Sequence, residues 1–115
     1  MYILYLTADL LFSSQVTGLV KSKGGEMAVV STAEDLIAHA TARETTLAIL
    51  DMNLSGINPR QVVNELRELT KECPILAHAP HVHQGKLNVA RDAGCDQVLT
   101  QGGFHREIAG ILDRL

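Results

Sequence analysis

The chain has 115 residues, of which 46% are hydrophobic and 20% are charged, a composition typical of a soluble protein with one domain spanning residues 1–115. No apolar run approaches the roughly 20 residues of a membrane span, and the apolar N-terminus lacks the basic region and cleavage site of a signal peptide. We therefore expect a cytoplasmic protein that does not bind membranes. The net charge of −3, with Lys and Arg scattered along the sequence, argues against direct binding to nucleic acid.

Short apolar runs alternate with longer segments of helical period, which predicts an α/β protein with five βα units around a parallel sheet. Several of the runs are apolar throughout, as strands are when helices cover both faces of a sheet. The expected strands are Tyr2–Leu6, Met27–Val30, Leu47–Leu50, Ile75–Ala79 and Gln97–Leu99.

The segments between these strands carry signals of helix ends. Thr32 stands three residues before Asp35 in a capping-box arrangement, and Asn58 is an N-cap candidate followed by a proline. Gly24-Gly25 suits the end of the first helix, and the helix from Gln84 to Ala93 has a weaker apolar pattern. The expected buried faces of the first, third and last helices are Phe12, Val16, Leu19 and Val20; Val62, Val63, Leu66 and Leu69; and Phe104, Ile108, Ile111, Leu112 and Leu115.

Asp51 directly follows the third apolar run and is the first candidate for a functional residue. In open α/β sheets, ligands and chemistry collect beyond the carboxyl ends of the strands, which is where this carboxylate falls. The alternative is that Asp51 caps its own turn by accepting backbone N–H bonds. The residues alone favour neither reading.

The order of the five units, Asp51 after the third strand, "PILAHAP" as the fourth strand and "DAGCDQVLTQ" leading into the fifth resemble a response-regulator receiver domain of the chemotaxis-regulator type. The resemblance covers essentially the whole chain. It implies a three-layer α/β/α sandwich of flavodoxin-like topology, with a five-stranded parallel sheet in the order 2-1-3-4-5. It also implies that Asp51 occupies the position of the phosphoacceptor.

The residues around Asp51 depart from the pattern that the resemblance implies. Two acids and a backbone carbonyl, here that of Asn53, would hold Mg²⁺ with the phosphoacceptor. Asp9 lies one residue too late to be the second acid, and we expect it to be the N-cap of the first helix. The resemblance implies two adjacent acids where this chain has Thr7 and Ala8, and a hydroxyl residue where it has Ala79. It implies a lysine at the position of Gln101 and an aromatic switch residue at that of Val98.

These departures remove the groups on which phosphoryl transfer depends, because the reaction relies on positioning and on charge stabilisation. Asp51 is the one carboxylate that is certain to lie at this site, and a single carboxylate is a poor Mg²⁺ site. We therefore interpret the chain as a pseudo-receiver, which is not an enzyme, needs no cofactor and signals by binding a protein partner or itself. Two alternatives stay open: a conventional receiver that uses Asp51, Asp9 and Mg²⁺, and a sensor of a small ligand or metal.

The same edge of the sheet carries features that bear on the sensor alternative. His81 and His83 are weak metal candidates, since two loop imidazoles are more often solvated, and His78 should lie within the strand. Gly102-Gly103 before the last helix could hold an anion, although a permissive turn is favoured. Cys73 and Cys95 form no CxxC pair, which argues against structural zinc or a redox motif.

The resemblance also implies a surface for partners or self-association, formed by the fourth helix, the fifth strand and the fifth helix. The fifth strand should lie at an edge of the sheet, where unpaired backbone is open to a partner. The apolar residues of the fourth helix spread over more than one stripe, so the sheet should leave part of them exposed. The candidate interface residues are Leu87, Val89, Arg91 and Val98.

Overall fold

The computed structural model describes residues 1–115 as five strands that alternate with five helices. In chain order the elements are β1 (Tyr2–Leu6), α1 (Leu10–Ser22), β2 (Glu26–Val30), α2 (Ala33–Ala42), β3 (Leu47–Asp51), α3 (Pro59–Leu69), β4 (Ile75–Ala79), α4 (Gln84–Asp92), β5 (Gln97–Thr100) and α5 (Gln101–Asp113).

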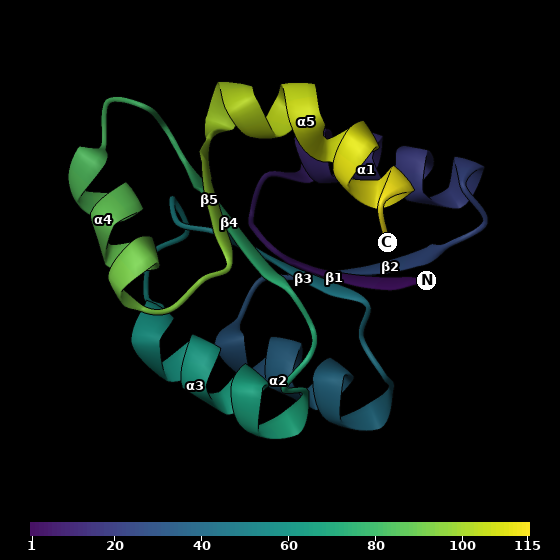
Figure 1. Ribbon diagram of the computed structural model, residues 1–115, viewed down its shortest axis with the longest axis horizontal. Helices are drawn as coiled ribbons and strands as arrows, with labels where there is room; N and C mark the ends of the chain where they lie inside the picture. The colour runs from purple at the N-terminus through teal and green to yellow at the C-terminus, as the bar shows by residue number, and fades with distance from the viewer.

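All five strands form one parallel sheet in the order β2-β1-β3-β4-β5, so the expected fold class and strand order are confirmed. Helices α1 and α5 cover one face of the sheet, while α2, α3 and α4 cover the other (Figure 1). The register pairs Asp51 of β3 with His78 of β4, and Ala79 of β4 with Thr100 of β5. The carboxyl ends of β3, β4 and β5 therefore lie side by side at one edge of the sheet.

Two hydrophobic cores hold the layers together, one on each face of the sheet. A cluster of 19 buried residues lies on the face covered by α2, α3 and α4, and a cluster of 12 lies under α1 and α5. Strands β1, β3 and β4 are buried along their whole length. Alternate residues of each strand feed the two cores, which is why these runs are mostly apolar rather than alternating.

The predicted N-caps are present. The side chains of Asp9, Thr32 and Asn58 accept the backbone N–H of the residue three positions on, at 2.9, 3.1 and 3.2 Å. Each bond satisfies one of the amide donors that a helix leaves free in its first turn. Gly24 follows α1 with a φ of +81°, a conformation that glycine adopts without a steric penalty.

Several expected details are wrong. Helix α5 begins at Gln101, directly after β5, so Gly102 and Gly103 lie in its first turn and not in a preceding loop. Thr100 caps this helix by accepting the N–H of Gly103 at 3.0 Å. Leu69 and Leu115, expected in the core, are each 44% exposed because one ends α3 and the other lies beyond the end of α5.

None of the helices has the length and apolar character needed to cross a membrane.

Candidate functional site

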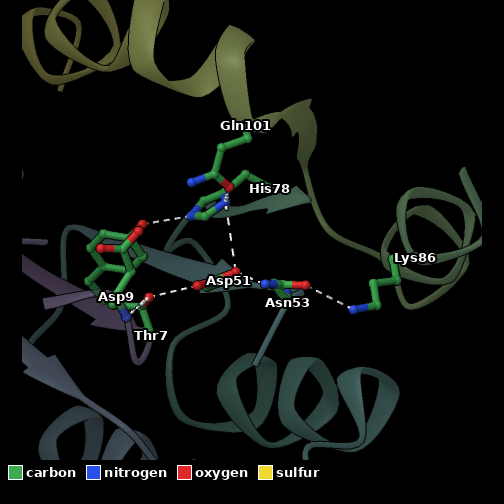
Figure 2. A network of polar contacts seen from close by, with 8 residues as sticks. Thr7, Asp9, Asp51, Asn53, His78, Lys86 and Gln101 are labelled. Carbon is green, nitrogen blue, oxygen red and sulfur yellow. Dashed lines mark hydrogen bonds and ion pairs between the residues drawn. The ribbon is translucent and has the colours of Figure 1, made fainter. Parts of the chain in front are cut away.

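Asp51 ends β3 at the carboxyl edge of the sheet, where its side chain is almost buried, with 7% of its surface exposed. The hydroxyl of Thr7 donates to Oδ2 at 2.6 Å, and the backbone N–H of Asn53 donates to Oδ1 at 2.9 Å (Figure 2). The carboxylate thus caps its own turn and also lines a cavity at this edge. The capping role is therefore confirmed, and the functional role of Asp51 stays a prediction.

The cavity beside Asp51 has a volume of about 450 Å³ and brings together most of the predicted pocket. Thr7 and Ala79 are not among the lining residues, because both side chains are buried. The lining residues are Ala8, Asp9, Asp51, Asn53, Leu54, Ser55, Pro80 and Gln101.

The residue that follows β1 supplies a hydroxyl where two acids were implied. Thr7 is buried and donates to Asp51, and its own oxygen accepts the backbone N–H of Asp9 at 3.0 Å. Ala8 offers no side-chain ligand. Asp9 lines the cavity, but its Oδ1 is bound to the first turn of α1, as expected of an N-cap.

These donors do not fit Mg²⁺, which needs several oxygen ligands in near-octahedral array. Asp51 is already bound by two neutral donors, and one oxygen of Asp9 is committed to the helix cap. No group of three or more His, Cys, Asp or Glu side chains is placed to hold a metal ion. His81 and His83 lie exposed in the loop before α4 and form no such group with Asp51.

A buried polar chain that the sequence did not predict lies directly behind Asp51. His78 is completely buried, its Nε2 lies 2.6 Å from the Tyr5 hydroxyl, and its Nδ1 lies 2.9 Å from Oε1 of Gln101 (Figure 2). Because that amide oxygen can only accept, Nδ1 carries a hydrogen, and in the neutral ring the Tyr5 hydroxyl donates to Nε2. Nδ1 of His78 also lies 3.9 Å from Oδ1 of Asp51.

The surroundings of His78 and Tyr5 favour the uncharged forms of both side chains. Burial lowers the pKa of His78, against the opposing effect of the Asp51 carboxylate. Burial also raises the pKa of Tyr5, and the charges of Asp51 and Asp9 raise it further. The ring of His78 stacks on Phe104, with centroids 4.4 Å apart, so it is packed as part of the core.

Gln101 stands where the resemblance placed a lysine, and its amide oxygen is bound to His78 rather than free in the cavity. The nearest lysine contact comes instead from α4, where Nζ of Lys86 donates to Oδ1 of Asn53 at 3.1 Å (Figure 2). No feature of the sequence marked Lys86 for this place, because the approach of α4 to the loop after β3 is a tertiary contact. A signal existed for His78 and Tyr5, since polar side chains within buried strands need partners.

The candidate interface residues differ in how far they are exposed to solvent. Leu87 is 2% exposed and packs in the core, so the expectation that it faces a partner is wrong. Val98 is half-buried against the same core. Val89 is 49% exposed, and Arg91 is exposed. One turn of α4 places Leu87 and Ala90 on the sheet and Val89 away from it.

The N-terminus of α5 is occupied by its own cap. Because the N–H of Gly103 is bound to Thr100, this donor is not free for an anion. The hypothesis that Gly102-Gly103 binds an anion assumed a glycine turn before the helix, and the structure has no such turn.

Comparison with models of known protein families finds no match, and comparison with curated protein sequences finds none either. The chain is, however, similar to solved receiver domains over almost its whole length. It matches the receiver domain of the TMAO respiratory system response regulator TorR with a TM-score of 0.85 and 18% identity, covering 98% of this chain and 93% of that one.

Two further solved structures give the same result. The receiver domain of the sensor histidine kinase PA1611 from Pseudomonas aeruginosa, which was determined with a magnesium ion in its active-site cleft, has a TM-score of 0.82 and 19% identity, with 98% of this chain and 94% of that one covered. A two-component response regulator from Clostridium difficile has a TM-score of 0.79 and 20% identity, covering 99% and 97%. The chain therefore has the fold of response-regulator receiver domains.

Proposed function

We propose that the chain is a pseudo-receiver: a non-enzymatic regulatory module of two-component signalling that acts by binding a protein partner or a second copy, without phosphorylation of Asp51. The proposal rests first on the receiver fold. It rests equally on the surroundings of Asp51, since a fold alone does not define an activity.

The observation that carries the proposal is the set of groups around the Asp51 carboxylate. Its two oxygens accept from the neutral Thr7 hydroxyl and from the backbone N–H of Asn53. A phosphoryl group on Asp51 would carry about 1.5 to 2 negative charges, which need cations or strong hydrogen-bond donors beside them. Ala8, Ala79 and Gln101 provide neither a metal ligand, nor a hydroxyl, nor a cation.

The partner surface in this proposal is formed by α4, β5 and α5. Strand β5 pairs only with β4, so its outer edge presents backbone groups without a strand partner. Gln97 is exposed on this strand, and Arg91 is exposed on the neighbouring helix α4. The mixture of an edge strand and a charged rim is typical of a modest protein interface.

Light scattering and a native pull-down with the full chain test this function. Asp51→Asn should keep the oligomeric state and the partner of the wild type, while Arg91→Glu should weaken both the association and the capture. Lys21→Glu, an exposed charge reversal on α1 at the opposite face, is the matched control. Loss of binding in Asp51→Asn, or equal binding by Arg91→Glu and the wild type, would contradict the proposal.

One observation supports a second candidate, the conventional receiver. Asp9 and Asp51 line the same cavity, so a second carboxylate stands close to the phosphoacceptor position even though it lies one residue late. This candidate predicts a covalent adduct on Asp51, which is the opposite of what the pseudo-receiver predicts.

A further inference from the structure

A groove lies between the loop that joins β3 to α3 and the N-terminal half of α4. Its volume is about 650 Å³, within the range of small-molecule sites. Leu54, Ile57 and Val89 contribute apolar walls, and Gly85 lies along the α4 side. A Cβ added at Gly85 would meet no atom within 4 Å, so a side chain has room at this position.

The one lysine of this groove has no counter-ion. Lys86 is half-buried, and its Nζ donates to the neutral amide oxygen of Asn53 at 3.1 Å (Figure 2). It takes part in no salt bridge. None of the residues lining the groove is acidic. A lysine ammonium beside apolar walls is complementary to a ligand with one negative end and a hydrocarbon body.

We propose that this groove binds a small apolar carboxylate. The ligand's carboxylate accepts from Nζ of Lys86, and its hydrocarbon chain packs against Leu54, Ile57 and Val89. The site uses none of the groups that bind the Asp51 side chain, so this inference goes beyond the proposed function and can fail independently of it. Asn53, Leu54 and Ser55 line both the groove and the cavity beside Asp51. Asn53 also links the two directly, since its backbone N–H binds Asp51 and its side chain binds Lys86.

An NMR titration of the full chain with octanoate at neutral pH tests the proposal. Saturable one-to-one binding is expected, with the largest amide shifts at Leu54, Gly85 and Val89 and a smaller shift at Asn53. Octan-1-ol has the same chain without the charge and should bind about tenfold more weakly, because it cannot form the charge-assisted bond to Lys86. Acetate and inorganic phosphate lack the apolar body and should show no saturable shifts in the groove.

Two variants make the test specific to this site. Lys86→Gln removes the charge and should weaken octanoate binding about tenfold without changing the affinity for octan-1-ol. Gly85→Leu adds a bulky side chain to a residue that lines the groove and should block both ligands. The matched controls are Lys21→Gln and Gly18→Leu on α1, where an added Cβ at Gly18 also meets nothing within 4 Å.

Thermal melts confirm that each variant is folded before its titration is interpreted. Octanoate binding by Lys86→Gln equal to that of the wild type would overturn the proposal, as would equal affinities for octanoate and octan-1-ol. Shifts concentrated elsewhere, or no saturable binding at all, would overturn it as well.

Discussion

The hydroxyl of Thr7 donates to a nearly buried carboxylate, so it should contribute more to stability than an ordinary hydrogen bond. We expect Thr7→Val to lower the free energy of unfolding by about 1.5 to 3 kcal/mol, the cost of a lost hydrogen bond to a charged group. Thr7→Ser keeps the donor and should lose less. Urea denaturation at neutral pH measures both, and a Thr7→Val variant as stable as the wild type would show that this bond does not hold Asp51.

His78 should make the stability of the protein depend on pH. Its folded pKa is lowered by burial, so the unfolded chain takes up the proton first as the pH falls. The stabilisation is complete above the unfolded pKa of about 6.5 and is lost below it, with a slope of up to about 1.4 kcal/mol per pH unit for one proton.

Denaturation curves between neutral pH and pH 5 measure this slope. His78→Gln can still accept from Tyr5 and donate to Gln101, and we expect it to flatten the dependence. His81→Gln, in the exposed loop, is the control. An unchanged slope in His78→Gln would assign the pH dependence to other groups.

At the scale of single residues, the sequence predicted the place of Asp51 and the capping role of Asp9 because both follow from position along one element. It did not predict the links of His78 to Tyr5 and Gln101, or of Lys86 to Asn53. These contacts join residues of different strands, helices and loops. Register and side-chain direction decide them, and neither is visible in a local pattern.

At the scale of elements, α5 shows where local propensity misleads. Gly102 and Gly103 indicated a turn because glycine is a poor helix former, yet both lie in the first turn of the helix. The Thr100 cap and the buried residues Phe104 and Ile108 hold this end of the helix against the sheet. Packing therefore outweighs the intrinsic cost of two glycines.

Alanine at two glycines tests the placement of these residues. We expect Gly102→Ala to raise the free energy of unfolding by about 0.4 to 1 kcal/mol, because its φ is not positive and its Cβ meets only the flexible guanidinium of Arg106, at 3.3 Å. Gly24→Ala should lower it by about 1 to 2 kcal/mol, since φ there is +81°. Thermal denaturation distinguishes the two, and a destabilised Gly102→Ala would place Gly102 in a turn.

At the scale of the whole molecule, alternating apolar runs and helical segments were enough to predict a parallel α/β sheet with helices on both faces. The order of the strands was implied by the resemblance to receiver domains, not by the pattern, because many orders satisfy the same alternation. The groove beside α4 was beyond prediction, since it depends on how a loop and a helix from distant parts of the chain approach each other.

The central claim concerns what this fold does with Asp51. Intact-mass spectrometry after incubation with Mg²⁺ and acetyl phosphate tests it most directly, with Asp51→Asn as the reference. We expect the wild type and the variant to keep their unmodified masses, because Ala8, Ala79 and Gln101 leave a phosphoryl group without metal, hydroxyl or cation. A stoichiometric phosphoryl adduct on the wild type that is absent from Asp51→Asn would contradict the account and make the chain a conventional receiver.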